Sequence, residues 1–252
     1  MRRRRGFTLV EVSLFLAVTG LLFLGVTIGV QNSIYQQRYS DTVQGFANFL
    51  RNIYDEVVNV QSVSNGRHGT AIYGKLVTFG ETEDKQSFFV YDVLGRAANS
   101  SDLGSGTTLS LLKQLGVTVA FRDNEEEPYK PVGIIEEYTP SWGAKIQPTD
   151  SFTDYKGTLL MVRDPRSGTV RTFVRNEATK VSDLIENASE PTRILIDILD
   201  AGGFAAGEVD FCVNPNGDEE SNNRTDVRLL DGASNASGVE IIDLDSDENR
   251  CR

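Results

Sequence analysis

The chain has 252 residues, of which 39% are hydrophobic and 24% are charged, and its formal net charge is −11. Its length suits one fair-sized domain, and a single histidine with only two cysteines excludes a zinc site built from Cys and His side chains. An acidic surface repels phosphate backbones, which disfavours general nucleic-acid binding. The histidine, His68, lies in the glycine-rich stretch NGRHGT, where a surface-loop residue is a better interpretation than a catalytic base.

The N-terminus combines a basic cluster with an apolar segment. Arginines occupy positions 2–5, and residues 12–30 carry no charge. A segment of that length can cross a bilayer core of roughly 30 Å as a helix. Because basic flanks stay in the cytoplasm, we expect the rest of the chain to face outward. One carboxylate, Glu11, lies at the start of the segment, and a carboxylate in hydrocarbon is costly unless it is paired.

Several interpretations of this segment compete. A secretory or twin-arginine signal peptide requires a cleavage site after the apolar run, and GVQNSIYQQRYSD contains no good one. A plain signal anchor explains the apolar run but not the position of Glu11. The third interpretation is a resemblance: RRRRGFTLVEVSLFLAVTGLLF is similar to the leader and first helix of type IV prepilins and type II secretion pseudopilins, with a basic leader, Gly6, Phe7, Glu11 and an apolar helix.

This resemblance implies that a prepilin peptidase cuts after Gly6 and methylates the new amine of Phe7. Glu11 would then pair with the Phe7 amine of a neighbouring subunit in a filament, where the Coulomb attraction is large in a water-poor core. Other implied partners are pilin or pseudopilin subunits, a membrane assembly platform with its ATPase, and membrane lipid before assembly. The implied location is the inner membrane, spanned once with the C-terminal domain outside, and then a surface or periplasmic filament.

A helical pattern continues beyond the apolar segment. Apolar residues between positions 34 and 58 recur mostly at spacings of three and four, and the breaker SVSNG follows. We therefore predict one helix over about residues 7–61. After a leader of residues 1–6, residues 7–30 would form the membrane or filament core. Residues 31–61 would be an amphipathic continuation of the helix, and residues 62–252 an outer β-rich domain.

The outer domain shows short β-rich runs separated by turns. We predict strands at 70–79, 86–93, 116–121, 132–138, 157–163, 169–175, 208–213, 225–230 and 238–244, with DPRSG as the turn of one hairpin. Helices are expected at 109–115 and 182–203. A long N-terminal helix packed on an antiparallel sheet is an α+β arrangement. The resemblance implies a pilin-like form of it.

The C-terminal segment suggests a disulfide and a minor subunit. Cys212 and Cys251 lie outside the membrane in this interpretation, where a disulfide is permitted, and many type IV pilins close a C-terminal loop in a comparable way. The stretch from FCVNPNG to the end also resembles, more loosely, the last hairpin of minor pseudopilins. Asp243, Asp245 and Asp247 are candidate calcium ligands, although the spacing departs from an EF-hand and a solvated acidic turn is the alternative.

The sequence therefore favours a structural subunit, a minor pilin or pseudopilin of a type IV pilus or type II secretion system, and not an enzyme. A membrane-anchored ectodomain enzyme is one alternative, although the chain has no G-x-S-x-G motif and no metal motif. A DNA-uptake pseudopilin is another, and it would require a basic stripe. Local basic positions that could contribute to one are Arg163, Arg166, Arg171 and Arg175.

Overall fold

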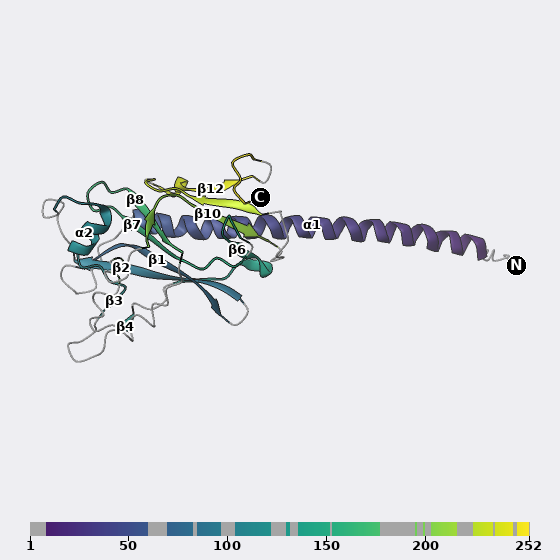
Figure 1. Cartoon of the computed structure of the whole chain (residues 1–252). Helices are drawn as coiled ribbons and strands as arrows, with labels where there is room; N and C mark the ends of the chain where they lie inside the picture. Colours follow the sequence, from purple (N-terminus) through teal and green to yellow (C-terminus); the bar gives the residue numbers. More distant parts are fainter. Residues whose placement is uncertain are drawn as a thin grey trace. The chain divides into compact units, whose positions relative to one another are not determined.

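The computed structural model describes residues 9–59, 70–82, 85–96, 104–121, 130–131, 136–151, 153–176, 195, 199, 203–215, 224–233, 235–243 and 246–251 (Figure 1). The chain divides into two units, Met1–Asp41 and Thr42–Arg252. The predicted helix at 182–203 lies largely outside the described residues. Within it, Leu195 and Leu199 are helical and buried. His68 also lies outside the described part of the chain.

Helix α1 runs from Leu9 to Val58 without a break. In the first unit it is apolar and exposed: Leu14, Phe15, Leu22 and Phe23 are 64–76% exposed. Its stretch Leu9–Thr27 has a mean hydropathy of 2.3 and is long and apolar enough to cross a membrane. A signal sequence near the N-terminus would meet the same two criteria. In the second unit the same helix becomes amphipathic, and its apolar side is buried.

A six-stranded antiparallel sheet forms the larger part of the second unit. Its order is β5 (Glu136–Tyr138), β2 (Lys85–Arg96), β1 (Thr70–Thr82), β7 (Thr158–Arg163), β8 (Val170–Arg175) and β9 (Ala205–Ala206). Strands β7 and β8 form the predicted hairpin around DPRSG, with Arg163 opposite Val170. The register of β1 against β2 shifts between Ile72 and Gly74, which marks a β-bulge.

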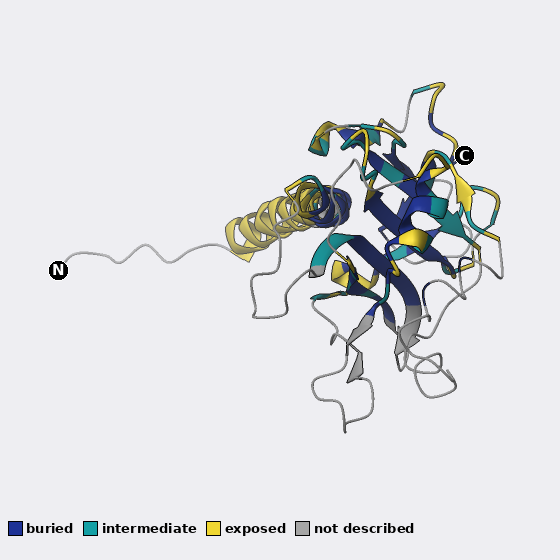
Figure 2. Ribbon diagram, turned by 90° about the vertical axis from the view of Figure 1, so that its left-hand side faces the viewer, coloured by how far each residue is buried: buried dark blue, intermediate teal, exposed yellow. Residues whose placement is uncertain are grey.

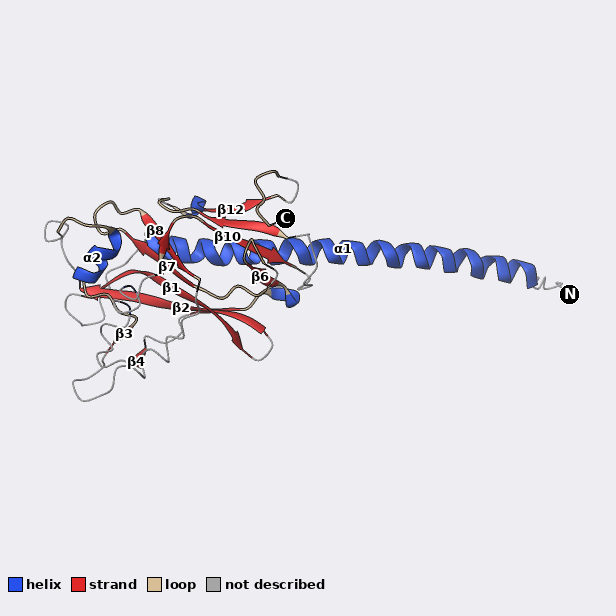
Figure 3. Ribbon diagram, in the orientation of Figure 1, coloured by secondary structure: helices blue, strands red, loops and turns tan. Residues whose placement is uncertain are grey.

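A second sheet has four antiparallel strands. Its order is β12 (Val239–Ile242), β11 (Thr225–Leu229), β10 (Val209–Asn214) and β6 (Lys145–Gln147). Strands β3 (Ala120–Phe121) and β4 (Lys130–Pro131) form a separate pair. The remaining elements are helix α2 (Thr108–Gln114) and the short helical turns η2 (Ser141–Gly143) and η4 (Ala236–Gly238), drawn among the helices in Figure 3.

The second half of α1 lies against a buried aromatic cluster. Phe46 contacts Phe88 of the six-stranded sheet and Phe211 of the four-stranded sheet, with ring centroids 5.6 and 5.5 Å apart. Burying an aromatic side chain stabilises a fold by about 1.5–3 kcal/mol, so this helix holds the two sheets together. A second cluster joins β1, β2, β7 and β8 to α2 and the residue that follows it through Leu112, Leu115 and Leu160, and Figure 2 shows this buried interior.

The fold class is α+β, an N-terminal apolar helix followed by a domain of antiparallel sheets, as predicted. Most predicted strands are present with ends shifted by a few residues. Of the run 116–121 only the last two residues form a strand, and Thr118 makes an isolated bridge with Leu94. Of 132–138 the described part, residues 136–138, is strand. Strands β4, β6 and β9 were not predicted, because two or three residues are too few for a periodic pattern to emerge.

Candidate functional site

The first candidate site is the start of α1. Glu11 lies in the first turn of the helix and is exposed. A carboxylate there is favoured by the positive end of the helix dipole. The proposed cleavage site, between Gly6 and Phe7, lies outside the described residues. Cleavage, methylation and the role of Glu11 in assembly therefore stay predictions.

The second half of α1 is fixed to both sheets by polar contacts. Towards the four-stranded sheet, the Tyr54 hydroxyl donates to the Ala233 carbonyl at 2.8 Å, and Arg51 donates to the Val239 carbonyl at 3.3 Å. Towards the six-stranded sheet, Arg163 of β7 donates to the Val58 carbonyl at 3.2 Å. A force applied to this helix is consequently transmitted to both sheets and not to one alone.

A buried lysine adds a charged contact between α1 and the six-stranded sheet. Lys75 is 6% exposed, and its ammonium lies 2.5 Å from Glu56 of α1 and 2.8 Å from Asp92, the residue opposite it on β2. Burial acts to lower the pKa of Lys75, but the hydrogen bonds and charges of Asp92 and Glu56 outweigh it, so the pKa is raised. Lys75 is therefore charged at any physiological pH.

The third candidate site is the C-terminal tail. Cys212 of β10 and Cys251 form a disulfide, with their Cα atoms 5.5 Å apart and both residues fully buried. Along β10 the apolar residues Val209, Phe211 and Val213 alternate with Asp210 and Cys212, and side chains alternate between the two faces of a strand. The disulfide therefore attaches the tail to the face of the four-stranded sheet that the aromatic cluster does not occupy.

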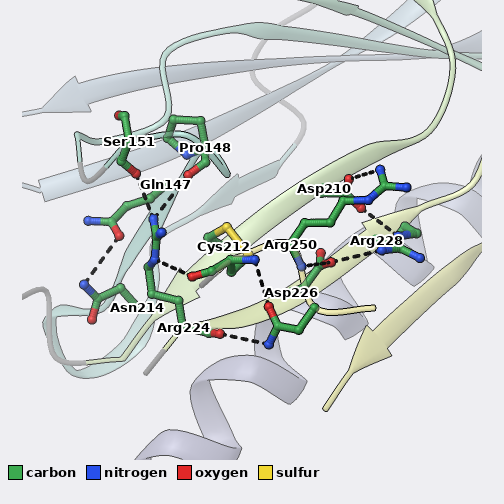
Figure 4. The surroundings of a disulfide bond; sticks show 12 residues. Gln147, Pro148, Ser151, Asp210, Cys212, Asn214, Arg224, Asp226, Arg228 and Arg250 are labelled. Atoms are coloured by element: carbon green, nitrogen blue, oxygen red, sulfur yellow. Dashed lines mark hydrogen bonds and ion pairs between the residues drawn. A yellow bond between two sulfur atoms is a disulfide. The ribbon is translucent and has the colours of Figure 1, made fainter. Parts of the chain in front are cut away.

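A chain of charged residues holds the tail on this face (Figure 4). Arg250 is paired with Asp210 at 2.6 Å and with Glu208 at 2.7 Å. Arg228 of β11 is paired with Asp210 at 2.7 Å and with Asp226 at 3.2 Å. Hydrogen bonds that involve an ionised partner contribute more than neutral ones, about 1.5–3 kcal/mol each. The tail is thus attached by ion pairs in addition to the disulfide.

Two further residues, Arg224 and Asn249, hydrogen-bond the tail to the rest of the domain. Arg224 is 2% exposed and donates to the carbonyls of Cys251 at 3.0 Å, Ser151 at 2.8 Å and Pro148 at 3.3 Å, as Figure 4 shows. Asn249 accepts a hydrogen bond from the Cys251 amide at 2.8 Å and donates to the Arg224 carbonyl at 3.3 Å. The end of the chain is therefore an integrated part of the domain.

Asp226 is the carboxylate of this network whose charge is least favourably placed. It is fully buried, and its Oδ1 atom has no hydrogen-bond partner, whereas Oδ2 accepts from Arg228 and from the Arg250 amide. Burial, followed by the negative charge of Asp210, raises the pKa of Asp226 despite the opposing effect of these donors. The folded state is therefore destabilised relative to the unfolded state as the pH rises from the unfolded-state pKa through the raised pKa of Asp226.

The predicted calcium ligands are not assembled into a site by the described residues. Asp243 and Asp247 are exposed, and Asp245 lies outside the described part of the chain. Among the residues that the structure describes, no group of three His, Cys, Asp or Glu side chains is arranged to hold a metal ion. Calcium binding in this turn stays a prediction.

The candidate basic stripe is engaged in local contacts. Arg171 is paired with Asp231 at 2.9 Å, and Arg166 donates to the Gly106 carbonyl. With the bond from Arg163 to α1, three of the four arginines hold parts of the domain together. Sequence reasoning missed these roles and the charged face under the tail. The only signal for that face was the alternation of charged and apolar residues in VDFCVN and TDVRL.

Comparison with known proteins identifies the N-terminus. Residues 1–27 match the family model described as the prokaryotic N-terminal methylation motif, which is the signature of type IV prepilins and pseudopilins. No curated protein and no solved structure matches the chain. The motif implies processing by a prepilin peptidase and assembly with other pilin subunits, and its proteins are structural subunits. Together with the apolar helix, it fits a single-pass membrane-anchored protein.

Proposed function

We propose that this chain is a structural subunit, a minor pilin or pseudopilin, of a type IV pilus or type II secretion filament. One observation carries the proposal: the methylation motif over residues 1–27 includes the exposed apolar stretch Leu9–Thr27 of α1. A helix with apolar residues on all sides requires either lipid or other apolar helices around it. A subunit that is first stored in a membrane and then assembled into a fibre uses both environments.

In this proposal the peptidase cuts after Gly6 and methylates the amine of Phe7, and Glu11 becomes the fifth residue of the mature chain. The Glu11 carboxylate of one subunit pairs with the Phe7 amine of a neighbour. Each charge offsets the desolvation of the other in the apolar filament core. A subunit in the wrong stagger would leave its carboxylate buried without that amine, so the pair favours the correct register.

Orientation and energy supply follow from the same proposal. The arginines at positions 2–5 keep the leader in the cytoplasm, and the second unit lies outside the membrane. Extraction from the bilayer is driven by the ATPase of a membrane platform, and burial of the apolar helix against other helices holds the fibre together. The polar contacts between α1 and both sheets would carry the outer domain with the helix during extraction.

The test is the mass and N-terminal residue of the protein produced with and without an active prepilin peptidase. We expect a mature chain that begins at Phe7 and is about 14 Da heavier than the unmodified fragment, the mass of one methyl group in place of hydrogen. A chain that still begins at Met1 in the presence of active peptidase would overturn the proposal. For assembly, Glu11→Ala should abolish entry into filaments, and Glu11→Asp, which keeps the charge, should retain part of it.

A further inference from the structure

Strand β9 ends the six-stranded sheet, and in the described part of the chain no strand pairs with its outer edge. Its two residues, Ala205 and Ala206, are exposed and pair with residues 173–174 of β8. The unpaired amide and carbonyl groups of an edge strand are a template on which a further strand can form. We therefore consider β9 as a binding site for an extended segment.

The backbone of Ala206 is directed away from β8. The Gly207 amide donates to the Thr172 carbonyl at 3.3 Å, which makes Thr172 and Gly207 a hydrogen-bonded pair of the antiparallel ladder. Such pairs alternate with pairs that do not exchange hydrogen bonds, so Phe173 and Ala206 do not bond to each other. The amide and carbonyl of Ala206 consequently point out of the sheet edge, where an incoming strand can bind both.

Two cavities flank this edge on opposite faces of the sheet. One has a volume of about 580 Å³ and is lined by Phe173, and the other has about 340 Å³ and is lined by Val174. Successive residues of β8 face opposite sides, whereas Ala206 lines both cavities. We call them the Phe173 cavity and the Val174 cavity. Because a strand added to β9 also alternates its side chains, it would place one in each cavity.

The Phe173 cavity has an apolar base. Phe173 is 5% exposed, and Leu109 and Phe204, both partly buried, complete the apolar lining. Cavities of this volume enclose ligands larger than one aromatic ring. An aromatic or large aliphatic side chain therefore fits it.

The charges of the Phe173 cavity balance one another. The Asp164 carboxylate accepts from the Thr108 hydroxyl at 2.6 Å and from the Arg166 amide at 2.9 Å, and Arg166 offsets its charge. Arg171, also in the lining, is paired with Asp231 at 2.9 Å. With no excess charge of either sign, the cavity favours an apolar side chain over a charged one.

The Val174 cavity is acidic. Its described lining includes the carboxylates of Asp150, Glu208 and Asp210 and no lysine, arginine or histidine. Arg250 pairs with Glu208 and Asp210, and Arg228 pairs with Asp210. Two guanidinium groups therefore face three carboxylates, which leaves an excess of one negative charge.

Neighbouring buried charges do not cancel this excess. Asp226 shares Arg228 at 3.2 Å, and Arg224 donates to the carbonyl of Pro148, a lining residue, at 3.3 Å. Asp226 and Arg224 add one charge of each sign. Since opposite charges attract more strongly near a protein surface than in bulk water, the Val174 cavity favours a basic side chain.

We propose that β9 binds an extended segment of a partner protein in which an apolar side chain and a basic side chain are adjacent. The apolar side chain enters the Phe173 cavity, the basic side chain enters the Val174 cavity, and the backbone bonds to Ala206. Strand addition of this kind takes affinity from main-chain hydrogen bonds and specificity from the side-chain pockets. The segment runs antiparallel to β9, because every pairing in this sheet is antiparallel and that pairing is the more stable one. The inference concerns the outer domain and holds whichever filament the chain joins.

The probe is a fluorescein-labelled peptide, Thr-Val-Phe-Lys-Val-Thr, added to the full chain in detergent micelles. In an antiparallel pair, the phenylalanine opposite Ala206 directs its amide to β9, and the adjacent lysine directs its amide away. Fluorescence anisotropy should show that N-methylation of the phenylalanine amide weakens binding at least about tenfold. N-methylation of the lysine amide is the matched control and should change affinity less than about twofold. Replacing the lysine by glutamate should weaken binding at least about tenfold, because the Val174 cavity repels it.

Variants of the chain test the same contact from the other side. Ala206→Pro removes the outward amide at an edge position that tolerates proline, and it should weaken binding at least about tenfold. Ala206→Ser keeps the amide and should bind as the wild type does. Hydrogen exchange locates the peptide: the amides of residues 204–206 should exchange more slowly in its presence, and those of residues 139–145 should not change.

Several outcomes would overturn the inference. These are no binding at about 1 mM peptide, a concentration that reveals even weak affinity, equal effects of the two N-methyl groups, and protection at another edge or face. Slower exchange of residues 204–206 on concentrating the chain without peptide would show that a second copy occupies β9, and it would overturn the assignment to a partner protein.

Discussion

The ammonium of Lys75, in the middle of strand β1, lies 2.5 Å from the carboxylate of Glu56 on helix α1. The same ammonium lies 2.8 Å from Asp92 on β2, so one buried charge joins the helix and two strands. The Glu56 side chain is 54% exposed and that of Asp92 only 16%. The two carboxylates therefore depend on Lys75 to different degrees, and substitution can separate their contributions.

We expect Lys75→Met to lower the free energy of unfolding by about 2–4 kcal/mol, because it leaves Asp92 with an uncompensated charge in a mostly buried place. Glu56→Gln is the control, and it should cost less than about 1 kcal/mol, since its side chain is solvated and Asp92 still pairs with Lys75. Urea unfolding of the full chain in detergent, followed by circular dichroism, measures both. Equal losses would contradict this account of the site.

Gly74 is required by the close approach of β1 and β7. A Cβ atom at this position would lie 2.1 Å from the Met161 carbonyl oxygen and 2.7 Å from the Cα of Val162. Since both are backbone atoms in a paired strand, they cannot move aside. We expect Gly74→Ala to destabilise the chain by about 3 kcal/mol or more. Gly20→Ala, which meets nothing within 4 Å, should be neutral or slightly stabilising in the same unfolding measurement.

The disulfide and the charged network hold the C-terminal tail independently. With a sequence separation of 39, the disulfide contributes up to about 4 kcal/mol in the chain-entropy model. Replacing Cys212 and Cys251 by Ala should lower stability by that order while the tail stays docked. Adding Arg250→Ala should release it, because the pairs with Asp210 and Glu208 are then lost.

Hydrogen exchange of the amides of residues 246–251 measures tail docking directly. In the double Cys→Ala variant these amides should remain protected, and in the triple variant they should exchange freely. Arg250→Ala alone, with the disulfide intact, is the matched control and should loosen the tail only in part. Full exchange in the double variant would show that the disulfide alone holds the tail.

The raised pKa of Asp226 gives the domain a specific pH dependence. A carboxyl group with a raised folded-state pKa contributes stability below its unfolded pKa of about 3.9, and this contribution is lost as the pH rises through the folded pKa. We expect Asp226→Asn to remove that loss. The stability of the variant relative to the wild type should therefore increase from pH 4 towards pH 7, as unfolding curves at several pH values would show.

Asp210→Asn provides the contrast. Asp210 pairs with both Arg228 and Arg250, so its neutralisation should lower stability by about 1–3 kcal/mol at pH 7. If the stability of the two variants changed with pH in the same way, the raised pKa of Asp226 would be contradicted. The two variants can be compared directly because Asp210 and Asp226 belong to one network and both pair with Arg228.

Much of the fold could be predicted from local patterns. The period of three and four up to Val58 indicates the docked half of α1, and DPRSG between two β-rich runs indicates the β7–β8 hairpin. Strands of two or three residues, such as β9, carry no period and exist only because β8 offers an edge to pair with. The pairing of Lys75 with Glu56 and Asp92 could not be predicted, because it depends on the register of β1 and on where α1 crosses it.

The sequence by itself determined the N-terminal motif, the apolar helix and the α+β class, since these depend on residue order and spacing along a continuous stretch of chain. The tertiary structure alone decided which residues meet across that order: the charged face of β10 and β11 that the tail covers, and the pairing of Lys75 with Glu56 and Asp92. Such contacts arise when segments distant in the sequence, such as β10 and the C-terminal tail or α1 and the residues around Ala233, are brought together by burial of a shared apolar core, so no local sequence pattern predicts them.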